Sequence, residues 1–196
     1  MIVAIVLAAG ESSRMGRPKA LLPIDGETFI ERIVGAFKES GLERILVVLG
    51  FHAEEMRRRI ERLPVEILVN ENYREGQLSS LKAAVRRAQE DQNCQAILVH
   101  LVDHPYLSPA VVRRMIDGYA ASKSPLVVPK YQGKRGHPVL FDRSLFGELL
   151  AAPLDQGAKA VVNAHRGETL EIDTGEIGVT IDIDTPDDYR RHVKSQ

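Results

Sequence analysis

Cysteine and tryptophan are almost missing from this sequence of 196 residues, which has one cysteine, Cys94, and no tryptophan. A single thiol excludes an intramolecular disulfide, and it excludes zinc sites of the finger or ribbon type, which need several cysteines. The sequence therefore favours a protein of the reducing cytoplasm, whose stability comes from a hydrophobic core.

An excess of charge of either sign is also missing. The 26 Lys and Arg residues and the 27 Asp and Glu residues give a formal net charge of −1. Nucleic acids and anionic membranes are usually attracted by a broad basic surface, so neither is expected as a partner. Any anion that this protein binds must be held by a local group of residues.

Long hydrophobic runs are missing too. The longest apolar run, residues 1–9, is too short to span a bilayer and lacks the basic segment with which a signal peptide begins. Its β-branched residues and its abrupt end at Gly10 predict instead a strand that is buried on both faces.

What is present is the composition of a globular domain, with 44% hydrophobic and 27% charged residues. A typical domain has about 150 residues, so we expect one domain over residues 1–196. Strand and helix patterns alternate along the chain. Strands are predicted at 1–9, 44–49, 65–69, 96–102 and 125–130, and helices from Thr28, at 54–63, at 79–90 and from Pro109. This alternation predicts an α/β fold, a doubly wound and mostly parallel sheet with helices on both faces.

The C-terminal third is less regular. We predict a turn at 133–136, a short strand at 139–141, helices at 144–150 and 158–165, and then two short strands. A last helix is predicted to begin at Thr185-Pro186, because a capping hydroxyl and a proline at the first helical position both favour a helix start. We expect this third of the chain to extend the same sheet.

The loop after the first strand, LAAGESSRMGRPK at residues 7–19, is the first candidate site. Open α/β sheets bind ligands at the carboxyl ends of their strands. Small residues let backbone N–H groups approach an anion, and Arg14 and Lys19 supply positive charge. The loop is neither a Walker A sequence nor a G-x-G-x-x-G fingerprint, which makes a dinucleotide-dependent dehydrogenase the weakest interpretation. From residue types alone, a phosphate-binding loop and an ordinary solvated loop remain equal alternatives.

The order of these residues resembles a known family. The segment LAAGESSRMGRPKALLP is similar to the signature of the MobA-like nucleotidyltransferases, in particular of their molybdenum cofactor cytidylyltransferase branch. Four further segments resemble blocks of that family in the same order: VNENYREGQLSSL, LVDHPYLSP, YQGKRGHPVLF and DIDTPDDY. The resemblance covers the whole chain. It implies a Rossmann-like nucleotidyltransferase fold with a nucleotide-binding half, about 1–105, and an acceptor-binding half, about 106–196.

The resemblance also implies a reaction and its residues. A nucleoside triphosphate would give its nucleotidyl group to a phosphate on a second substrate, and pyrophosphate would be released. Lys19 and Arg14 would bind the triphosphate, with Asp103 as a third catalytic residue. Asp103 and Asp184, or less favourably Asp182, would hold Mg²⁺ or Mn²⁺, which bind few carboxylates together with phosphate oxygens and water. Base and ribose would lie against Leu7, Ala8, Ala9 and Gly10.

Other site residues come from the later blocks. Asn70, Ser79 and Ser80 would lie near the nucleotide, although capping a helix or closing a turn would also explain these residue types. The acceptor side would include His104, Gly136, His137, Pro138 and Asp155.

Three positions bear on the substrates. Ala9 gives the A-A-G form that the family associates with a pyrimidine nucleotide, so CTP is preferred over GTP, with molybdopterin as acceptor and a molybdoenzyme as a possible recipient of the product. His104 stands where this branch usually has Gln. Lys159 stands where it has Arg, and a lysine and an arginine are not equivalent toward phosphate. The alternatives are a sugar or polyol phosphate acceptor, GTP as donor, or a nucleotide-binding chaperone for cofactor insertion.

Overall fold

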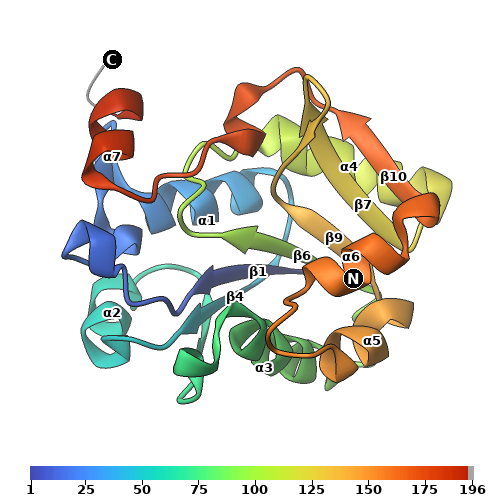
Figure 1. Ribbon diagram of the computed structural model, residues 1–196, viewed down its shortest axis with the longest axis horizontal. Helices are drawn as coiled ribbons and strands as arrows, with labels where there is room; N and C mark the ends of the chain where they lie inside the picture. The colour runs from blue at the N-terminus through green and yellow to red at the C-terminus, as the bar shows by residue number, and fades with distance from the viewer. Residues whose placement is uncertain (194–196) are drawn as a thin grey trace.

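A mostly parallel sheet forms the centre of the protein (Figure 1). The computed structural model describes residues 1–193. Strands of the sheet follow the order β10-β7-β9-β6-β1-β4-β5, and β8 pairs with β7. Only β9 and β8 pair antiparallel with their neighbours in this described sheet. The strands are β1 (Ile2–Ala8), β4 (Arg44–Leu49), β5 (Glu66–Val69), β6 (Ala96–Leu101), β7 (Leu126–Tyr131), β8 (Lys134–Arg135), β9 (Val139–Asp142) and β10 (Thr169–Asp173).

Helices cover both faces of the sheet, as the alternating pattern predicts. One hydrophobic cluster packs α1 (Phe29–Glu39), α2 (Ala53–Ile60) and α4 (Pro109–Ser122) against one face. The other cluster packs α3 (Gln77–Gln89), α5 (Phe146–Ala151) and α6 (Lys159–Ala164) against the opposite face. The predicted α/β fold with a doubly wound, mostly parallel sheet is therefore confirmed.

Helix starts follow the capping residues of the sequence. Thr28 and Glu31 form a capping box at the start of α1, and Ser108 accepts a hydrogen bond from the backbone N–H of Val111 at the start of α4. The last helix, α7 (Pro186–His192), begins with a second capping box, between Thr185 and Asp188. Each such cap stabilises its helix by about 1 kcal/mol, so these local signals fix where the elements begin.

Two parts of the chain differ from the sequence-based expectation. Only one of the two short strands predicted near the C-terminus is present, β10, because residues Ile177–Thr180 form a 3-10 turn instead. A hairpin of β2 (Pro23–Ile24) and β3 (Glu27–Thr28) was not predicted. Its turn residues Asp25 and Gly26 have φ of 48° and 89°, and an Asp-Gly pair is a known signal for such a turn.

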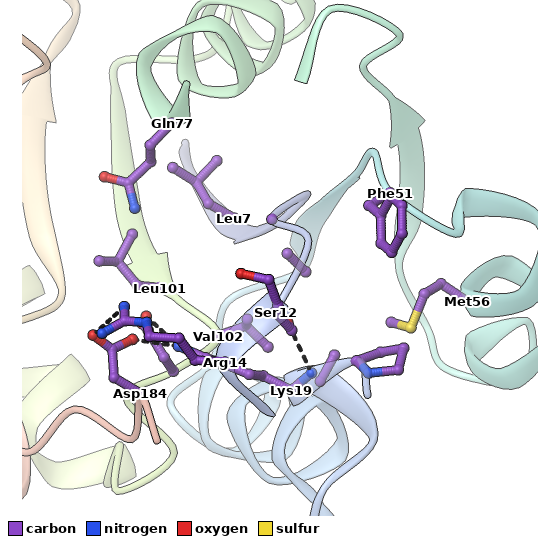
Figure 2. Close-up of a pocket in the computed structure, with 16 residues that line it drawn as sticks. Leu7, Ser12, Arg14, Lys19, Phe51, Met56, Gln77, Leu101, Val102 and Asp184 are labelled. Atoms are coloured by element: carbon purple, nitrogen blue, oxygen red, sulfur yellow. Dashed lines mark hydrogen bonds and ion pairs between the residues drawn. The ribbon is translucent and has the colours of Figure 1, made fainter. Parts of the chain in front are cut away.

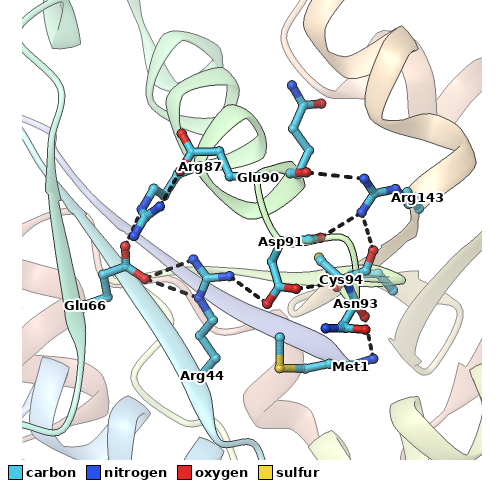
Figure 3. Close-up of polar contacts among 11 residues, drawn as sticks. Met1, Arg44, Glu66, Arg87, Glu90, Asp91, Asn93, Cys94 and Arg143 are labelled. Carbon is cyan, nitrogen blue, oxygen red and sulfur yellow. Dashed lines mark hydrogen bonds and ion pairs between the residues drawn. The ribbon is translucent and has the colours of Figure 1, made fainter.

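The amino edge of the sheet is held by a polar network (Figure 3). Arg44 Nη2 donates to Glu66 Oε2 over 3.1 Å, which joins β4 to β5, and Arg44 Nη1 lies 3.5 Å from Asp91 Oδ2. Arg143 donates to the Cys94 carbonyl over 2.6 Å. Burial raises the pKa of the Cys94 thiol, which makes this thiol unreactive. The residues predicted to take part in chemistry lie at the opposite edge of the sheet.

Candidate nucleotide and metal site

A cavity opens at the carboxyl edge of the sheet, where β1, β4 and β6 end (Figure 2). We call it the first cavity. The residues that line it include Leu7, Ala8, Gly10, Arg14, Lys19, Phe51, Gln77, Asp103 and Asp184. The loop after β1, the start of α3 and the segment before α7 thus meet in one place, although they are far apart in the sequence.

The loop after β1 folds back on itself so that its cations face this cavity. Ser12 and Gly16 have φ of 51° and 68°, and a 3-10 turn, Ser13–Met15, lies between them. The backbone N–H of Lys19 donates to Ser12 Oγ over 3.2 Å. A side chain added at Gly10 would meet no atom within 4 Å, so the cradle beside this glycine is open.

Lys19 lies between two carboxylates. Its Nζ pairs with Asp184 Oδ1 and lies 3.4 Å from Asp103 Oδ2. Arg14 Nη2 donates to the other Asp184 oxygen over 2.8 Å. The hydrogen bond from Lys19, together with the charges of Lys19 and Arg14, lowers the pKa of Asp184 against the opposing effect of burial. Both predicted cations and both predicted metal ligands are therefore brought together.

The segment before α7 places Asp184 and Asp182 at different cavities. The Ile183 N–H donates to the Asp103 carbonyl over 2.8 Å, which fixes this segment beside Asp103. Asp184 lines the first cavity, whereas Asp182 lines another one beyond Asp103. Of the two carboxylates that the sequence left open, Asp184 is the one placed to share a cation with Asp103.

The residues present fit a divalent cation. Asp103 Oδ1 is buried without a hydrogen-bond partner, and such an atom gains from a cation. Residues 1–193 contain no group of three or more His, Cys, Asp or Glu side chains that could hold a metal. Two carboxylates and no protein cage suit Mg²⁺ or Mn²⁺, which complete their coordination with phosphate oxygens and water.

A smaller cavity, which we call the second cavity, adjoins the first. It is lined by Leu7, Ala9, Gly10, Tyr73, Gly76, Gln77 and Ser80. Among the residues predicted near the nucleotide, Ser80 lies in this wall, whereas Asn70 and Ser79 lie behind it. Asn70 Nδ2 donates to both serine hydroxyls, over 2.9 and 3.0 Å, and Ser79 Oγ donates to the Gly76 carbonyl over 2.8 Å. Asn70 and Ser79 thus hold the first turn of α3, which carries Ser80.

Three of the five predicted acceptor residues, His104, Gly136 and His137, line another cavity, which we call the third cavity. It is lined by His104, Val128, Arg135, Gly136, His137, Val139, Val162, Thr180 and Asp182. Gly136 is required by a close approach, because an added Cβ would lie 1.9 Å from the Val179 carbonyl oxygen. Pro138 follows in a cis peptide. Asp155 lies on an exposed turn between α5 and α6 and lines neither the first nor the third cavity.

Three histidines lie close together near Asp103, with His100 fully buried and with His104 and His137 partly exposed in the wall of the third cavity. The rings of His104 and His137 are 4.8 Å apart, and His100 lies 6.2 and 6.3 Å from them. Burial lowers the pKa of His137 to about 4, and repulsion from His104 adds to this effect. Burial also lowers the pKa values of His100 and His104. Burial therefore favours the neutral form of all three imidazoles.

Several lining residues were not predicted from the sequence. Phe51 follows the end of β4, and Gln77 is the first residue of α3. The rule that ligands bind at the carboxyl ends of strands points to Phe51, because the ends of β1 and β4 lie side by side. The sequence signal for Gln77 is weaker. It is the preceding glycine, Gly76, which marks the turn before α3 and has a φ of 100° in the structure. Figure 2 shows the Gln77 amide directed into the cavity.

Comparison with known proteins identifies the family. The model of the MobA-like NTP transferase domain matches residues 4–169. The chain belongs to this family. A MobA-like NTP transferase is a nucleotidyltransferase, so the expected enzyme class is confirmed. Within residues 1–193 no helix is both long and apolar enough to cross a membrane.

Relatives of this MobA-like NTP transferase carry different names. Molybdenum cofactor cytidylyltransferase from Escherichia coli (strain K12) is 29% identical over 94% of this chain and 92% of its own length. Nicotine blue oxidoreductase from Paenarthrobacter nicotinovorans is 31% identical over 97% of this chain and 95% of its own length. The chain is therefore similar to proteins whose names describe different reactions.

Solved structures agree with the fold. A crystal structure of Rv0371c from Mycobacterium tuberculosis H37Rv superposes with a TM-score of 0.87 and 33% identity, over 98% of this chain and 97% of that one. A complex of Rv0371c with manganese superposes with a TM-score of 0.84 and 31% identity, over 100% of this chain and 99% of that one. A protein of very similar fold was thus solved with a divalent cation.

Proposed function

We propose that this nucleotidyltransferase transfers the cytidylyl group of CTP to the phosphate of molybdopterin. An oxygen of the acceptor phosphate attacks the α-phosphorus and forms a new P–O bond. The bond from the α-phosphorus to pyrophosphate breaks, and its electron pair leaves with pyrophosphate. The attacking oxygen is already anionic near neutral pH, so the reaction needs no side-chain nucleophile or general base. Positioning and charge neutralisation supply the catalysis.

One observation carries this proposal, the position of Lys19 between the carboxylates of Asp103 and Asp184 in the wall of the first cavity. A nucleotidyl transfer needs cations for the leaving pyrophosphate and carboxylates for a divalent metal, and here both lie within one group of side chains. His104, the next residue after Asp103, and Asp182, two residues before Asp184, line the third cavity, from which an acceptor can approach.

The charged residues of the first cavity divide between phosphate binding and metal binding. Lys19 and Arg14 bind the triphosphate and neutralise the charge that develops on pyrophosphate. Asp103 and Asp184 would hold Mg²⁺, with Mn²⁺ as a substitute. When bound, such a cation neutralises phosphate charge and orients the phosphate oxygens. Lys19 exchanges its carboxylate partners for phosphate oxygens when the triphosphate enters, because the pairs lie in the wall of the same cavity.

The nucleotide assignment depends on the second cavity. Ala9 lies in its wall together with Gly10 and Ser80, and the Ala9 methyl group leaves less room for a purine than a glycine would. The backbone of Leu7–Gly10 holds base and ribose, and Ser80 bonds to the base. CTP is therefore preferred over GTP. Acceptor binding is assigned to His104, Gly136 and His137 in the wall of the third cavity, and to Pro138, which follows His137 in the chain.

A comparison of nucleotides tests the donor. Preferential binding to the folded state raises the melting temperature, so CTP with Mg²⁺ should stabilise the protein more than GTP, ATP or UTP. Stabilisation by GTP alone would overturn the choice of CTP. Purified protein should then release pyrophosphate from CTP on addition of molybdopterin, and release with a sugar or polyol phosphate under the same conditions would reassign the acceptor.

A second candidate function is oxidoreduction, favoured by the name of the 31% identical relative. The sequence argues against a dinucleotide site of the usual kind because it has no G-x-G-x-x-G fingerprint. The discriminating assay is oxidation of NADH or NADPH with an aromatic acceptor. If the protein is a nucleotidyltransferase, it should not oxidise NADH or NADPH, and it should release pyrophosphate in a reaction that Asp103→Asn abolishes.

A further inference from the structure

Unpartnered buried polar atoms are concentrated at one place in the described chain. Among residues 1–193, four buried side-chain atoms have no hydrogen-bond partner, and they belong to His100, Asp103, His104 and His137. Asp103 has been placed as a metal ligand, and His104 and His137 line the third cavity. His100 lines neither of these cavities, so the proposed reaction gives no reason for a histidine there.

His100 lies in β6 and is only 1% exposed. Its ring packs edge-on against Phe37, with 6.0 Å between centroids. Its Nε2 is 2.8 Å from the His104 carbonyl oxygen. A carbonyl only accepts hydrogen bonds, so Nε2 carries the proton and Nδ1 keeps an unpartnered lone pair.

The His100 bond closes the turn that carries Asp103. The His104 N–H donates to the Leu101 carbonyl over 3.1 Å, and the Asp103 carbonyl accepts from the Ile183 N–H over 2.8 Å. With the bond from His100, the carbonyl groups of both Asp103 and His104 are held. The direction of the Asp103 side chain toward Lys19 and Asp184 depends on this turn.

A histidine at this position is unfavourable for folding alone. Burial removes Nδ1 from water without a partner, and the rest of β6 is apolar from Ala96 to Val99. A leucine would fill a similar volume with no polar atom to bury. The benefit of His100 must therefore lie in the hydrogen bond that its Nε2 donates.

We propose that His100 is a positioning residue for the metal ligand Asp103, acting through its hydrogen bond to the His104 carbonyl. This inference rests on the metal role of Asp103 in the proposed function. Residues that orient a ligand without touching the metal typically change metal affinity by about 10- to 100-fold when replaced.

Three substitutions separate positioning from packing. His100→Leu removes the donor, whereas His100→Gln places an amide N–H where Nε2 lies, because both atoms stand at the same number of bonds from Cβ. His100→Asn places its amide only where Nδ1 lies and is the matched control that cannot reach the carbonyl. We expect Leu and Asn to weaken Mn²⁺ binding about tenfold in calorimetry with a non-hydrolysable CTP analogue. Gln should restore affinity to within about threefold of the parent protein.

Two further measurements make the outcome decisive. The Leu variant should melt at the same temperature as the parent or higher, and its His104 backbone amide should exchange hydrogen about tenfold faster, with the Gln variant near the parent rate. Unchanged exchange in the Leu variant, or Gln and Asn variants that behave alike, would overturn the inference. Failure of the parent protein to bind Mn²⁺ would instead overturn the metal role of Asp103, while amide exchange still decides the role of His100.

Discussion

The first cavity is lined by Asp103 and the third cavity by the next residue, His104, and the two cavities differ in their charged residues. In the first cavity, Lys19 and Arg14 form direct ion pairs with Asp184, and Arg14 is largely exposed, with 65% of its side chain accessible. In the third cavity, the partly exposed His104 and His137 have lowered pKa values and lie beside the valine side chains of β7, β9 and α6, and Arg135 and Asp182 are the charged residues of its wall.

This difference matches the two substrates of a nucleotidyl transfer. A triphosphate brings several negative charges, which exposed cations and a divalent metal can neutralise without a large desolvation cost. An acceptor with a single phosphate brings fewer charges, for which one arginine, Arg135, is present, and the histidines and valines of the same wall suit the rest of such a molecule. The first cavity should therefore control chemistry, and the third cavity should control acceptor choice.

The substitution with the largest expected effect is Asp103→Asn, which tests whether the first cavity controls the chemistry. The substitution removes a charge from the proposed metal site but keeps the size of the side chain, so turnover should fall by about 1000-fold while the melting temperature changes little. Asp182→Asn is the matched control, because Asp182 lines the third cavity, and it should keep most of the turnover. Equal loss in both variants would contradict the assignment of Asp184 over Asp182 as the partner of Asp103.

The next test fills the open cradle of the first cavity. An added side chain at Gly10 meets nothing within 4 Å, so Gly10→Leu should fold normally while occupying space needed by the nucleotide. The KM for the nucleotide should rise by about 10- to 100-fold, equivalent to about 1.4 to 2.7 kcal/mol of binding. Gly35→Leu in α1 is the control, since a side chain there also meets nothing within 4 Å. A normal nucleotide KM for the Gly10 variant would place the nucleotide elsewhere.

The same contrast explains what the sequence could predict. The fold could be predicted because helix and strand periodicity repeat over long segments. Part of the first cavity could be predicted because the loop after β1 supplies many of its lining residues from one continuous segment. The ion pair between Lys19 and Asp184 joins residues 165 positions apart. Sequence periodicity cannot predict such a pair, and only the family resemblance placed both residues in one site. The turn at 177–180 has an apolar pattern like a strand, yet its Val179 carbonyl bonds to the His137 N–H instead of a neighbouring strand.

On the third cavity, His137→Phe should affect only the acceptor. The substitution keeps a ring in the same place but removes both nitrogens, so the acceptor KM should rise by about 5- to 10-fold, in line with one lost hydrogen bond. The nucleotide KM should remain within about twofold of the parent, because His137 does not line the first cavity. Steady-state kinetics with each substrate varied in turn measures both values. A parallel rise in both would show that the two cavities are not separate in function.

The smallest effect concerns the stability of the acceptor side. His165 Nδ1 lies 2.7 Å from Glu168, and His165 Nε2 lies 2.8 Å from Glu148, so hydrogen bonds to Glu148 and Glu168 raise the pKa of His165. A pKa raised in the folded state gives stability that is fully present below the unfolded value of about 6.5 and is lost as pH rises through the folded value. His165→Gln should therefore lower the melting temperature more at pH 6 than at pH 9.

The expected difference for His165 is small because the paired glutamates are exposed, and such ion pairs contribute less than about 1 kcal/mol. The control is Glu66→Gln at the amino edge, which removes an ion pair with Arg44 that contains no histidine, so its effect should be the same at both pH values. Melting curves at pH 6 and pH 9 with matched ionic strength measure the change. If the His165 variant loses equal stability at both pH values, its role is packing between α5 and the turn after α6, and the acceptor side has no pH-dependent ion pair there.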